Sequence, residues 1–282
     1  MKLNKETAEI YVPDNAPVAE ALDRTTHLCI AAHQDDIEIM AVQPILECFH
    51  EKDKWFTGVV FTDGRGSPRN GDYAQTTNEE MRLIRIEEQR KAAMIGNYSA
   101  LVFLDYPSSE IKNATDPKPV EDLVQMLRAT KPTYVYTHNL ADKHDTHIAV
   151  VLRVIQALRV LNPQERPEKV IGCEVWRSLD WVNDEEKIVM DLSSHFNQQE
   201  ALLGVFDSQI AGGKRYDLAA MSRRQVNATF FDSHGVDLMS GASFGIDLTP
   251  LMNEPTIAPL DYVLAYIQRF GNDVRERISR MS

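Results

Sequence analysis

Short apolar runs alternate with longer amphipathic stretches over the first 161 residues of the chain. Strands are predicted where the runs are rich in β-branched or aromatic side chains, near residues 27–33, 56–62, 100–104 and 133–137. Helices are predicted over residues 38–51, 78–95, 119–130 and 146–161. This alternation predicts an α/β fold with a Rossmann-like, mostly parallel sheet that carries helices on both faces.

A polar, proline-bearing segment at residues 162–169 interrupts the pattern. Beyond it, strands are predicted at 170–176 and 187–192, and helices at 195–207, 214–226 and 260–280. No repeat or low-complexity segment divides the chain. We therefore expect a single domain over 1–282, with an N-terminal extension at 1–24 and a C-terminal helical appendage at about 211–282.

Two polar clusters stand at strand-to-helix turns about a hundred residues apart. The first follows the strand at 27–33 and contains His33, Asp35, Asp36 and Glu38; the second follows the strand at 133–137 and contains His138, Asp142, His144, Asp145 and His147. Ligands of open α/β sheets bind at the carboxyl ends of the strands. Histidines and carboxylates from separate loops are what a catalytic zinc site needs, although the first cluster alone fits a helix-capping turn equally well.

The first cluster, His-Gln-Asp-Asp-Ile-Glu at 33–38, resembles the Ala-His-Pro-Asp-Asp-x-Glu signature of the PIG-L/LmbE-like N-deacetylases. The second, at 142–147, resembles the Asp-x-His-x-Asp-His motif of that family, and ordered similarity extends over roughly residues 25–210. The resemblance implies an LmbE-like fold and a zinc enzyme that removes the acetyl group from an N-acetylglucosamine-type conjugate. Its products would be acetate and a free amine.

The resemblance also implies a role for each matching residue. His33, Asp36 and His147 are the expected ligands of one Zn²⁺ per chain, and Fe²⁺ is an alternative because imidazole and carboxylate ligands select weakly between the two metals. Asp35 is the expected general base. His144 is expected to stabilise the oxyanion as a protonated donor, held by Asp142 or Asp145.

Three positions depart from the family pattern. Gln34 replaces the signature proline, and Ile39–Gln43 lacks the usual pair of glycines. Thr146 replaces the aspartate before the last histidine, so Asp142 or Asp145 must substitute for it. We expect these departures to affect the substrate and the rate more than metal binding.

Substrate contacts are assigned to Arg65, Arg69 and Glu38. The two arginines follow the strand at 56–62, where pocket-lining and an ordinary loop are equally supported. In the family, the region from 211 to 256 often contributes to the substrate pocket. The Arg223–Arg224 pair there predicts either a solvated helix face or a clamp for an anionic group. His138 is expected beside the site, whereas His27, His50 and His195 are expected to be ordinary histidines.

Composition limits the partners. The formal net charge of −12 argues against nonspecific binding to nucleic acid or to an anionic membrane surface. No stretch approaches the roughly 20 apolar residues of a membrane helix, and the N-terminus has no apolar signal core. We expect a cytoplasmic protein that acts on a small N-acetyl sugar or a similar amide; the sequence leaves homo-oligomerisation open.

Two other functions remain open from the sequence. The first is a different metal-dependent amide or ester hydrolase on the same scaffold. The second is a catalytically weak carbohydrate-binding relative. A nucleotide-binding Rossmann domain is disfavoured, because the turn at 33–36 lacks the glycines and its two carboxylates would repel phosphate.

Overall fold

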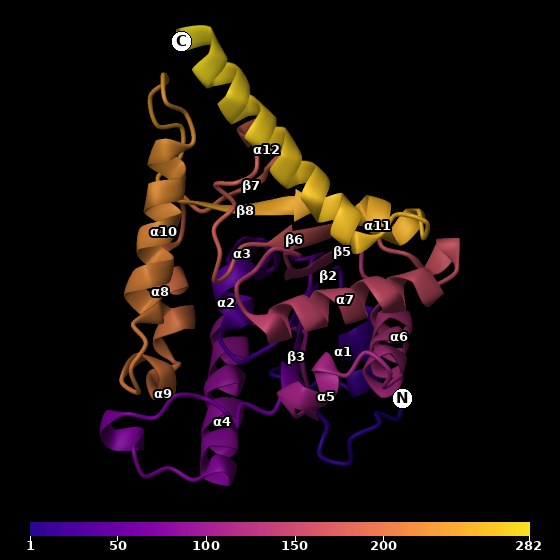
Figure 1. Cartoon of the computed structure of the whole chain (residues 1–282). Helices are drawn as coiled ribbons and strands as arrows, with labels where there is room; N and C mark the ends of the chain where they lie inside the picture. Colours follow the sequence, from indigo (N-terminus) through magenta and orange to yellow (C-terminus); the bar gives the residue numbers. More distant parts are fainter.

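An eight-stranded sheet runs through the middle of the molecule (Figure 1). The computed structural model describes all residues from 1 to 282. The strands are β1 (Glu9–Tyr11), β2 (His27–Ala31), β3 (Phe56–Thr62), β4 (Ala100–Tyr106), β5 (Tyr134–His138), β6 (Lys169–Cys173), β7 (Ile188–Asp191) and β8 (Ala242–Asp247), in the spatial order β1-β4-β3-β2-β5-β6-β8-β7.

The five central strands, β4, β3, β2, β5 and β6, are mutually parallel. At the edges, β1 pairs antiparallel with β4, and β8 pairs antiparallel with both β6 and β7. Every residue of β2, β3 and β4 is buried, as expected for parallel strands covered on both faces. The predicted mostly parallel α/β fold is confirmed.

Helices cover both faces of this sheet. They are α1 (Val18–Asp23), α2 (Asp36–Met40), α3 (Val42–His50), α4 (Asn78–Ile95), α5 (Ser108–Lys112), α6 (Lys118–Thr130), α7 (Asp145–Val160), α8 (Phe196–Gly204), α9 (Asp207–Ile210), α10 (Tyr216–Phe230), α11 (Thr249–Asn253) and α12 (Pro259–Met281). Short 3₁₀ turns lie at Gly71–Tyr73, Pro163–Glu165 and Asp184–Glu186.

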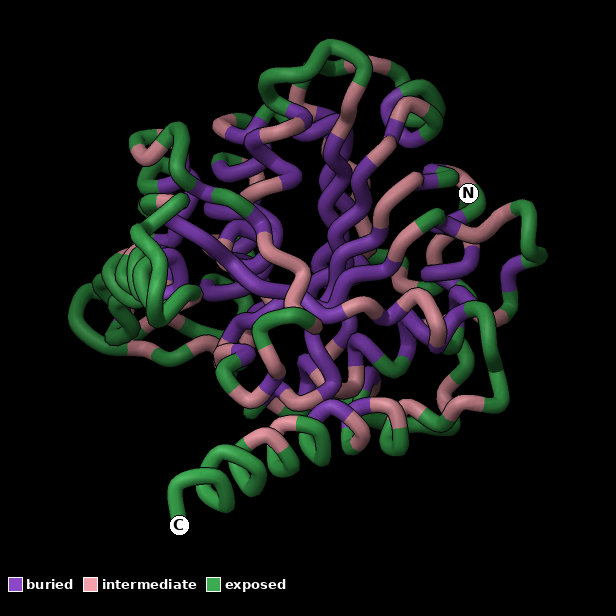
Figure 2. The backbone as a smooth tube through the Cα atoms, turned by 90° about the horizontal axis from the view of Figure 1, so that it is seen from above, coloured by how far each residue is buried: buried purple, intermediate pink, exposed green.

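Two apolar cores lie on opposite faces of the sheet. Leu28 and Ile30 of β2 pack into the core shared with α1, α6, α7 and α12, whereas Cys29 and Ala31 pack into the core shared with α2, α3, α4 and α8. Figure 2 shows the buried centre and the exposed C-terminal part of α12, which projects from the body. No helix combines the length and apolar character needed to cross a membrane.

The structure adds elements that the apolar pattern does not predict. Residues 9–11 and 242–247 are strands of the sheet, and the helix predicted over 38–51 is two helices separated at Ala41. The strand at 9–11 is too short to show alternation. The strand at 242–247 has the sequence Ala-Ser-Phe-Gly-Ile-Asp, in which the small residues conceal its place in the sheet.

Candidate active site

The two polar clusters meet because β2 and β5 are neighbours. These strands pair in parallel, with Cys29 opposite Tyr136, so the loops that follow them leave the same edge of the sheet side by side. Chain progression also reverses here, because β3 and β4 extend the sheet on one side of β2 and β6 extends it beyond β5. Such a switch point is where open α/β sheets bind ligands.

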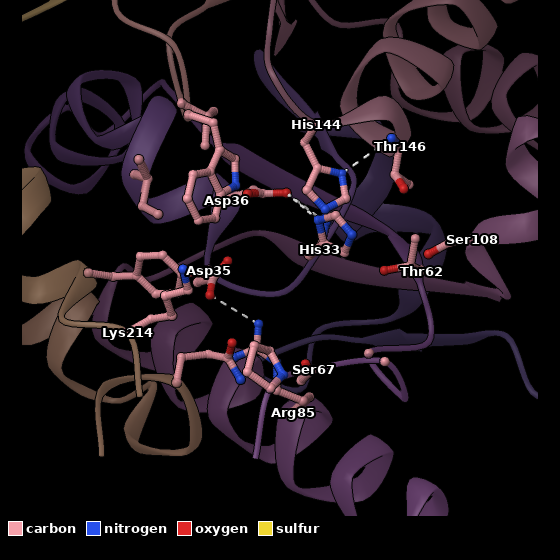
Figure 3. A pocket seen from close by; sticks show the side chains of 18 of the residues that line it. His33, Asp35, Asp36, Thr62, Ser67, Arg85, Ser108, His144, Thr146 and Lys214 are labelled. Atoms are coloured by element: carbon pink, nitrogen blue, oxygen red, sulfur yellow. Dashed lines mark hydrogen bonds and ion pairs between the residues drawn. The ribbon is translucent and has the colours of Figure 1, made fainter. Parts of the chain in front are cut away.

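Ring nitrogens of two histidines and one carboxylate oxygen converge at this point, and Figure 3 shows two of the three residues, His33 and Asp36. Nδ1 of His33 lies 3.1 Å from Oδ2 of Asp36 and 3.2 Å from Nε2 of His147. The Asp36 oxygen is 3.2 Å from the same His147 nitrogen. The structure therefore brings together all three residues predicted as metal ligands.

This triangle of donor atoms fits a zinc or iron ion. Zinc bonds of about 2.0–2.2 Å at tetrahedral angles place ligand atoms roughly 3.3 Å apart, close to the separations found here. Two wider groups are also possible, His144 with His33 and His147, and His138 with Asp36 and His147. In each group the possible ligand atoms all lie within 4.8 Å of one another. Nε2 of His138, however, already accepts the backbone N–H of Ala32 at 2.9 Å.

Buried neighbours fix the orientation of His147. Oδ1 of Asp142 lies 3.5 Å from Nδ1 of His147, on the side of the ring away from Asp36. Asp142 also accepts the backbone N–H groups of His144 and Trp176, at 3.0 and 3.1 Å. The ring of His138 stacks on that of His147, with centroids 3.9 Å apart. A carboxylate behind a ligand histidine fixes the tautomer and the direction of the ring.

The site favours a positive charge at His147. Burial alone would lower the pKa of this imidazole, but the carboxylates of Asp36 and Asp142 outweigh it and raise the pKa to about 9. Burial would raise the pKa of Asp36, yet His147 and His33 hold it well below its usual value. A cation between these groups is therefore stabilised electrostatically, as a metal site requires.

Asp35 occupies a strained backbone position beside the cluster. Its φ of 90° lies in a region that non-glycine residues rarely adopt, at a cost of about 1–3 kcal/mol. Its backbone N–H donates to Oε1 of Gln89 at 3.1 Å, and its Oδ2 accepts from Arg85 at 3.1 Å. Burial raises the pKa of Asp35 to about 7, against the opposing charge of Arg85. A carboxyl that titrates near neutrality suits proton transfer.

The state of His144 differs from expectation. Burial, together with His33 and His147, lowers its pKa to about 4, so the ring is neutral near pH 7 rather than protonated. Nδ1 of His144 accepts the backbone N–H of Thr146 at 3.3 Å, which leaves the ring proton on Nε2. Thr146, where the family has an acid, supplies no charge to hold a second proton. His144 can therefore donate only as a neutral imidazole.

These groups open into a cavity of about 540 Å³. Its floor carries His33, Asp35 and Asp36. One wall is formed by the loop after β3 and by α5, and the facing wall by the segment after β6 and the start of α10. The lining also includes Thr62, Gly64, Ser67, Ser108, Lys112, Val175, Trp176, Gln209, Lys214, Arg215, Tyr216 and Arg223.

Three substrate assignments from the sequence are not supported by this geometry. Glu38 is fully buried and does not line the cavity; Tyr98 and Gln89 both donate to its Oε1 at 2.6 Å. Arg65 pairs with Asp63 and Glu79, and Arg69 donates to Asn78 and to the carbonyl of Arg65. These arginines hold the loop in place and do not line the cavity.

The structure also places Asp145 and the Arg223–Arg224 pair. Asp145 is exposed at the start of α7, so Asp142 is the acid that contacts the cluster. Arg223 lines the cavity, whereas Arg224 is buried and donates to the carbonyls of Glu38 and Ile39 in α2. The predicted arginine pair therefore divides between two roles.

The signature proline has a specific replacement. Nε2 of Gln34 donates to the backbone carbonyl of Thr62 at 3.1 Å, and the backbone carbonyl of Gln34 accepts from Arg85. Gly64 lies directly beside this contact at a φ of 70°, and a Cβ there would be 2.7 Å from Oε1 of Gln34. The side chain of Gln34 thus joins the first motif to the end of β3, and a glycine is required opposite it.

Sequence reasoning missed several lining residues. Trp176 is the last residue of the strand predicted at 170–176, and the rule that strand ends line the site would have identified it. Arg85 lies in the helix that resembles the family, but nothing in its spacing indicates a contact with Asp35. Lys214 and Tyr216 reach the cavity only through the turn between α9 and α10, which the sequence does not specify.

Comparison with known proteins gives one family and a set of structural neighbours. The family model PIG-L, described as GlcNAc-PI de-N-acetylase, matches residues 28–158. No curated protein matches the chain.

Among solved structures, the conserved protein TT1542 from Thermus thermophilus has a TM-score of 0.61 at 19% identity, over 83% of this chain and 99% of its own. GalB, the 4-carboxy-2-hydroxymuconate hydratase from Pseudomonas putida, has a TM-score of 0.60 at 19% identity, over 79% and 96%. The N,N'-diacetylchitobiose deacetylase from Pyrococcus horikoshii has a TM-score of 0.57 at 17% identity, over 78% and 83%. At these identities the neighbours establish the fold alone.

Proposed function

Because residues 28–158 belong to the PIG-L family, we propose that the chain is a zinc-dependent deacetylase. Its proposed reaction is hydrolysis of the N-acetyl group of an N-acetylglucosamine-type conjugate, giving acetate and a free amine. The observation that carries this proposal is the convergence of His33, Asp36 and His147 to within 3.2 Å beside the carboxyl of Asp35.

His33, Asp36 and His147 would hold the metal. A bound zinc ion supplies polarisation of the acetamide carbonyl and lowers the pKa of a water molecule toward neutrality; Fe²⁺ supplies the same chemistry. Asp142 supports the donor set by orienting His147 from behind. His33 lies in the loop after β2, whereas Asp36 and His147 lie in the first turns of α2 and α7, and His33 and Asp36 face the cavity.

Asp35 acts as the general base and then as the general acid. It accepts a proton from the attacking water, and the tetrahedral intermediate forms as water adds to the acetamide carbon. The proton then passes to the nitrogen as the C–N bond breaks, which releases the amine and acetate. Arg85 holds the Asp35 carboxyl in place at the cavity floor, beside the proposed metal ligands.

His144 donates to the carbonyl oxygen as negative charge develops there. Its Nδ1 accepts from Thr146, so the proton on Nε2 is the one available to the substrate. A neutral imidazole is a weaker donor than an imidazolium, and we expect a correspondingly slower reaction than in relatives that keep the acid.

The test is amine release from N-acetylglucosamine conjugates by zinc-loaded protein, with Asp35→Asn beside it. Asparagine is the proper replacement because it tolerates positive φ. We expect turnover to fall at least about 100-fold while metal content is kept. Release by both proteins at similar rates would contradict the role of Asp35. Cleavage of non-acetylated amides alone would favour the other hydrolase, and tight sugar binding without release would favour a binding protein.

A further inference from the structure

One wall of the cavity carries two cations without a salt-bridge partner, although the charge of Arg223 also acts on the buried carboxyl of Glu174. This wall, which we call the cationic wall, consists of Trp176, Lys214, Tyr216 and Arg223. Nζ of Lys214 lies 5.2 Å from the centre of the Trp176 ring, and Arg223 donates to the carbonyl of Val175. Neither forms a salt bridge. Arg215, which also lines the cavity, is different because it pairs with Asp217 at 2.7 Å.

The acids of the cavity are already compensated from within the protein. Asp35 pairs with Arg85, and Asp63 pairs with Arg65. Asp36 lies between the two histidines of the proposed metal site. On the opposite wall, the exposed Lys112 has no acid partner. The charge left for a ligand is therefore positive, although the whole chain has a formal net charge of −12.

The wall also offers aromatic surface. The rings of Trp176 and Tyr216 are 5.9 Å apart and nearly perpendicular, at 85°. Such rings contact the apolar face of a sugar or of an aglycone, while lysine and arginine beside them bind carboxylates or phosphates through charge-assisted hydrogen bonds. The two chemistries on one wall match a substrate that presents a ring and an anion together.

We propose that the cationic wall recognises an anionic group, a carboxylate or a phosphate, on the part of the substrate away from the reacting amide. This inference rests on the proposed function for the position of the acetamide at the cavity floor. Lys214 and Arg223 are the specificity-determining residues. A neutral conjugate would occupy the same cavity but leave both cations without a partner.

The inference is tested by a matched pair of ligands, the 4-carboxyphenyl and 4-carbamoylphenyl N-acetyl-β-glucosaminides. They have nearly the same shape and differ by one charge. Calorimetric affinities for zinc-loaded Asp35→Asn protein require no turnover, so the test remains valid even if the deacetylase proposal fails. We expect the carboxylate to bind at least about tenfold more tightly. N-acetylglucosamine 1-phosphate beside N-acetylglucosamine tells whether phosphate is preferred over carboxylate.

Variants separate the wall from other sources of the preference. Lys214→Gln should reduce the preference for the charged glycoside without removing a backbone contact. Lys214→Gln combined with Arg223→Gln should abolish this preference. Arg223→Lys keeps the charge and should retain most of it. Arg215→Gln, a charge already paired, should leave it unchanged.

Two results would overturn the proposal. The first is equal affinity for the charged and neutral glycosides in the parent protein. The second is a preference that survives the double substitution but disappears when the metal is removed, because the anion would then bind the metal and not the wall.

Discussion

At the scale of single residues, Asp142 and not Asp145 is the acid beside His147, where Thr146 replaces the family's aspartate. Its carboxylate lies behind the ring of His147, whereas Asp145 is exposed at the first position of α7. We predict that Asp142→Asn lowers zinc affinity by about 10- to 100-fold, because the ligand histidine loses its orienting acceptor. Competition with a chromophoric chelator measures the affinity. Asp145→Asn is the matched control and should bind zinc normally; equal losses in both variants would refute the assignment.

Glu38 gives a prediction about stability and pH. Burial raises its pKa from 4.5 to about 8. Between these values the folded chain keeps a proton that the unfolded chain has lost, so this carboxyl makes stability fall as pH rises, by at most about 1.4 kcal/mol per pH unit. Glu38→Gln keeps an acceptor for Tyr98 and Gln89 and places an amide at Oε2, which has no partner.

We therefore expect Glu38→Gln to gain stability relative to the parent as pH rises from 5 to 7.5. Urea unfolding of the metal-free proteins at the two pH values measures the difference. A stability difference that is the same at both pH values would show that Glu38 is already ionised in the folded chain.

At the scale of elements, α10 stabilises the short helix that carries Asp36. Arg224 donates to the carbonyl of Glu38 at 2.8 Å and to Oε1 of Gln199 at 3.1 Å. This contact lies next to the region where the family glycines are missing. Arg224→Met leaves these buried acceptors unpaired, and we predict a loss of about 1–3 kcal/mol or more in unfolding free energy. Arg275→Met on exposed α12 is the control, and similar small losses in both would argue against the contact.

The sequence predicts elements better than their pairing. The strands at 56–62 and 100–106 are apolar throughout, and their side-chain character alone identifies them. The place of β8 between β6 and β7 depends on contacts between segments far apart in the chain. Likewise, the polar clusters identify His33, Asp36 and His147, but the positions of Lys214 and Tyr216 follow from tertiary packing that no local pattern encodes.

At the scale of the whole molecule, the parallel sheet assembles the site by placing β2 beside β5. Residues 33–36 and 142–147 become neighbours only through this pairing, and the surrounding loops then define the ligand. A hydratase and a deacetylase share this fold with the chain at similar TM-scores, 0.60 and 0.57. Fold therefore does not determine the reaction, and the cluster of His33, Asp36 and His147 beside Asp35 supports the proposed deacetylase reaction.

The most direct test is the metal content of the purified protein by plasma mass spectrometry, beside Asp36→Ala prepared identically. We predict about one zinc or iron ion per chain in the parent and a clear loss in the variant, with circular dichroism confirming that both are folded. Absence of metal from the folded parent, even after reconstitution with zinc, would contradict this prediction. His33, Asp36 and His147 would then be a buried polar cluster and not a metal site.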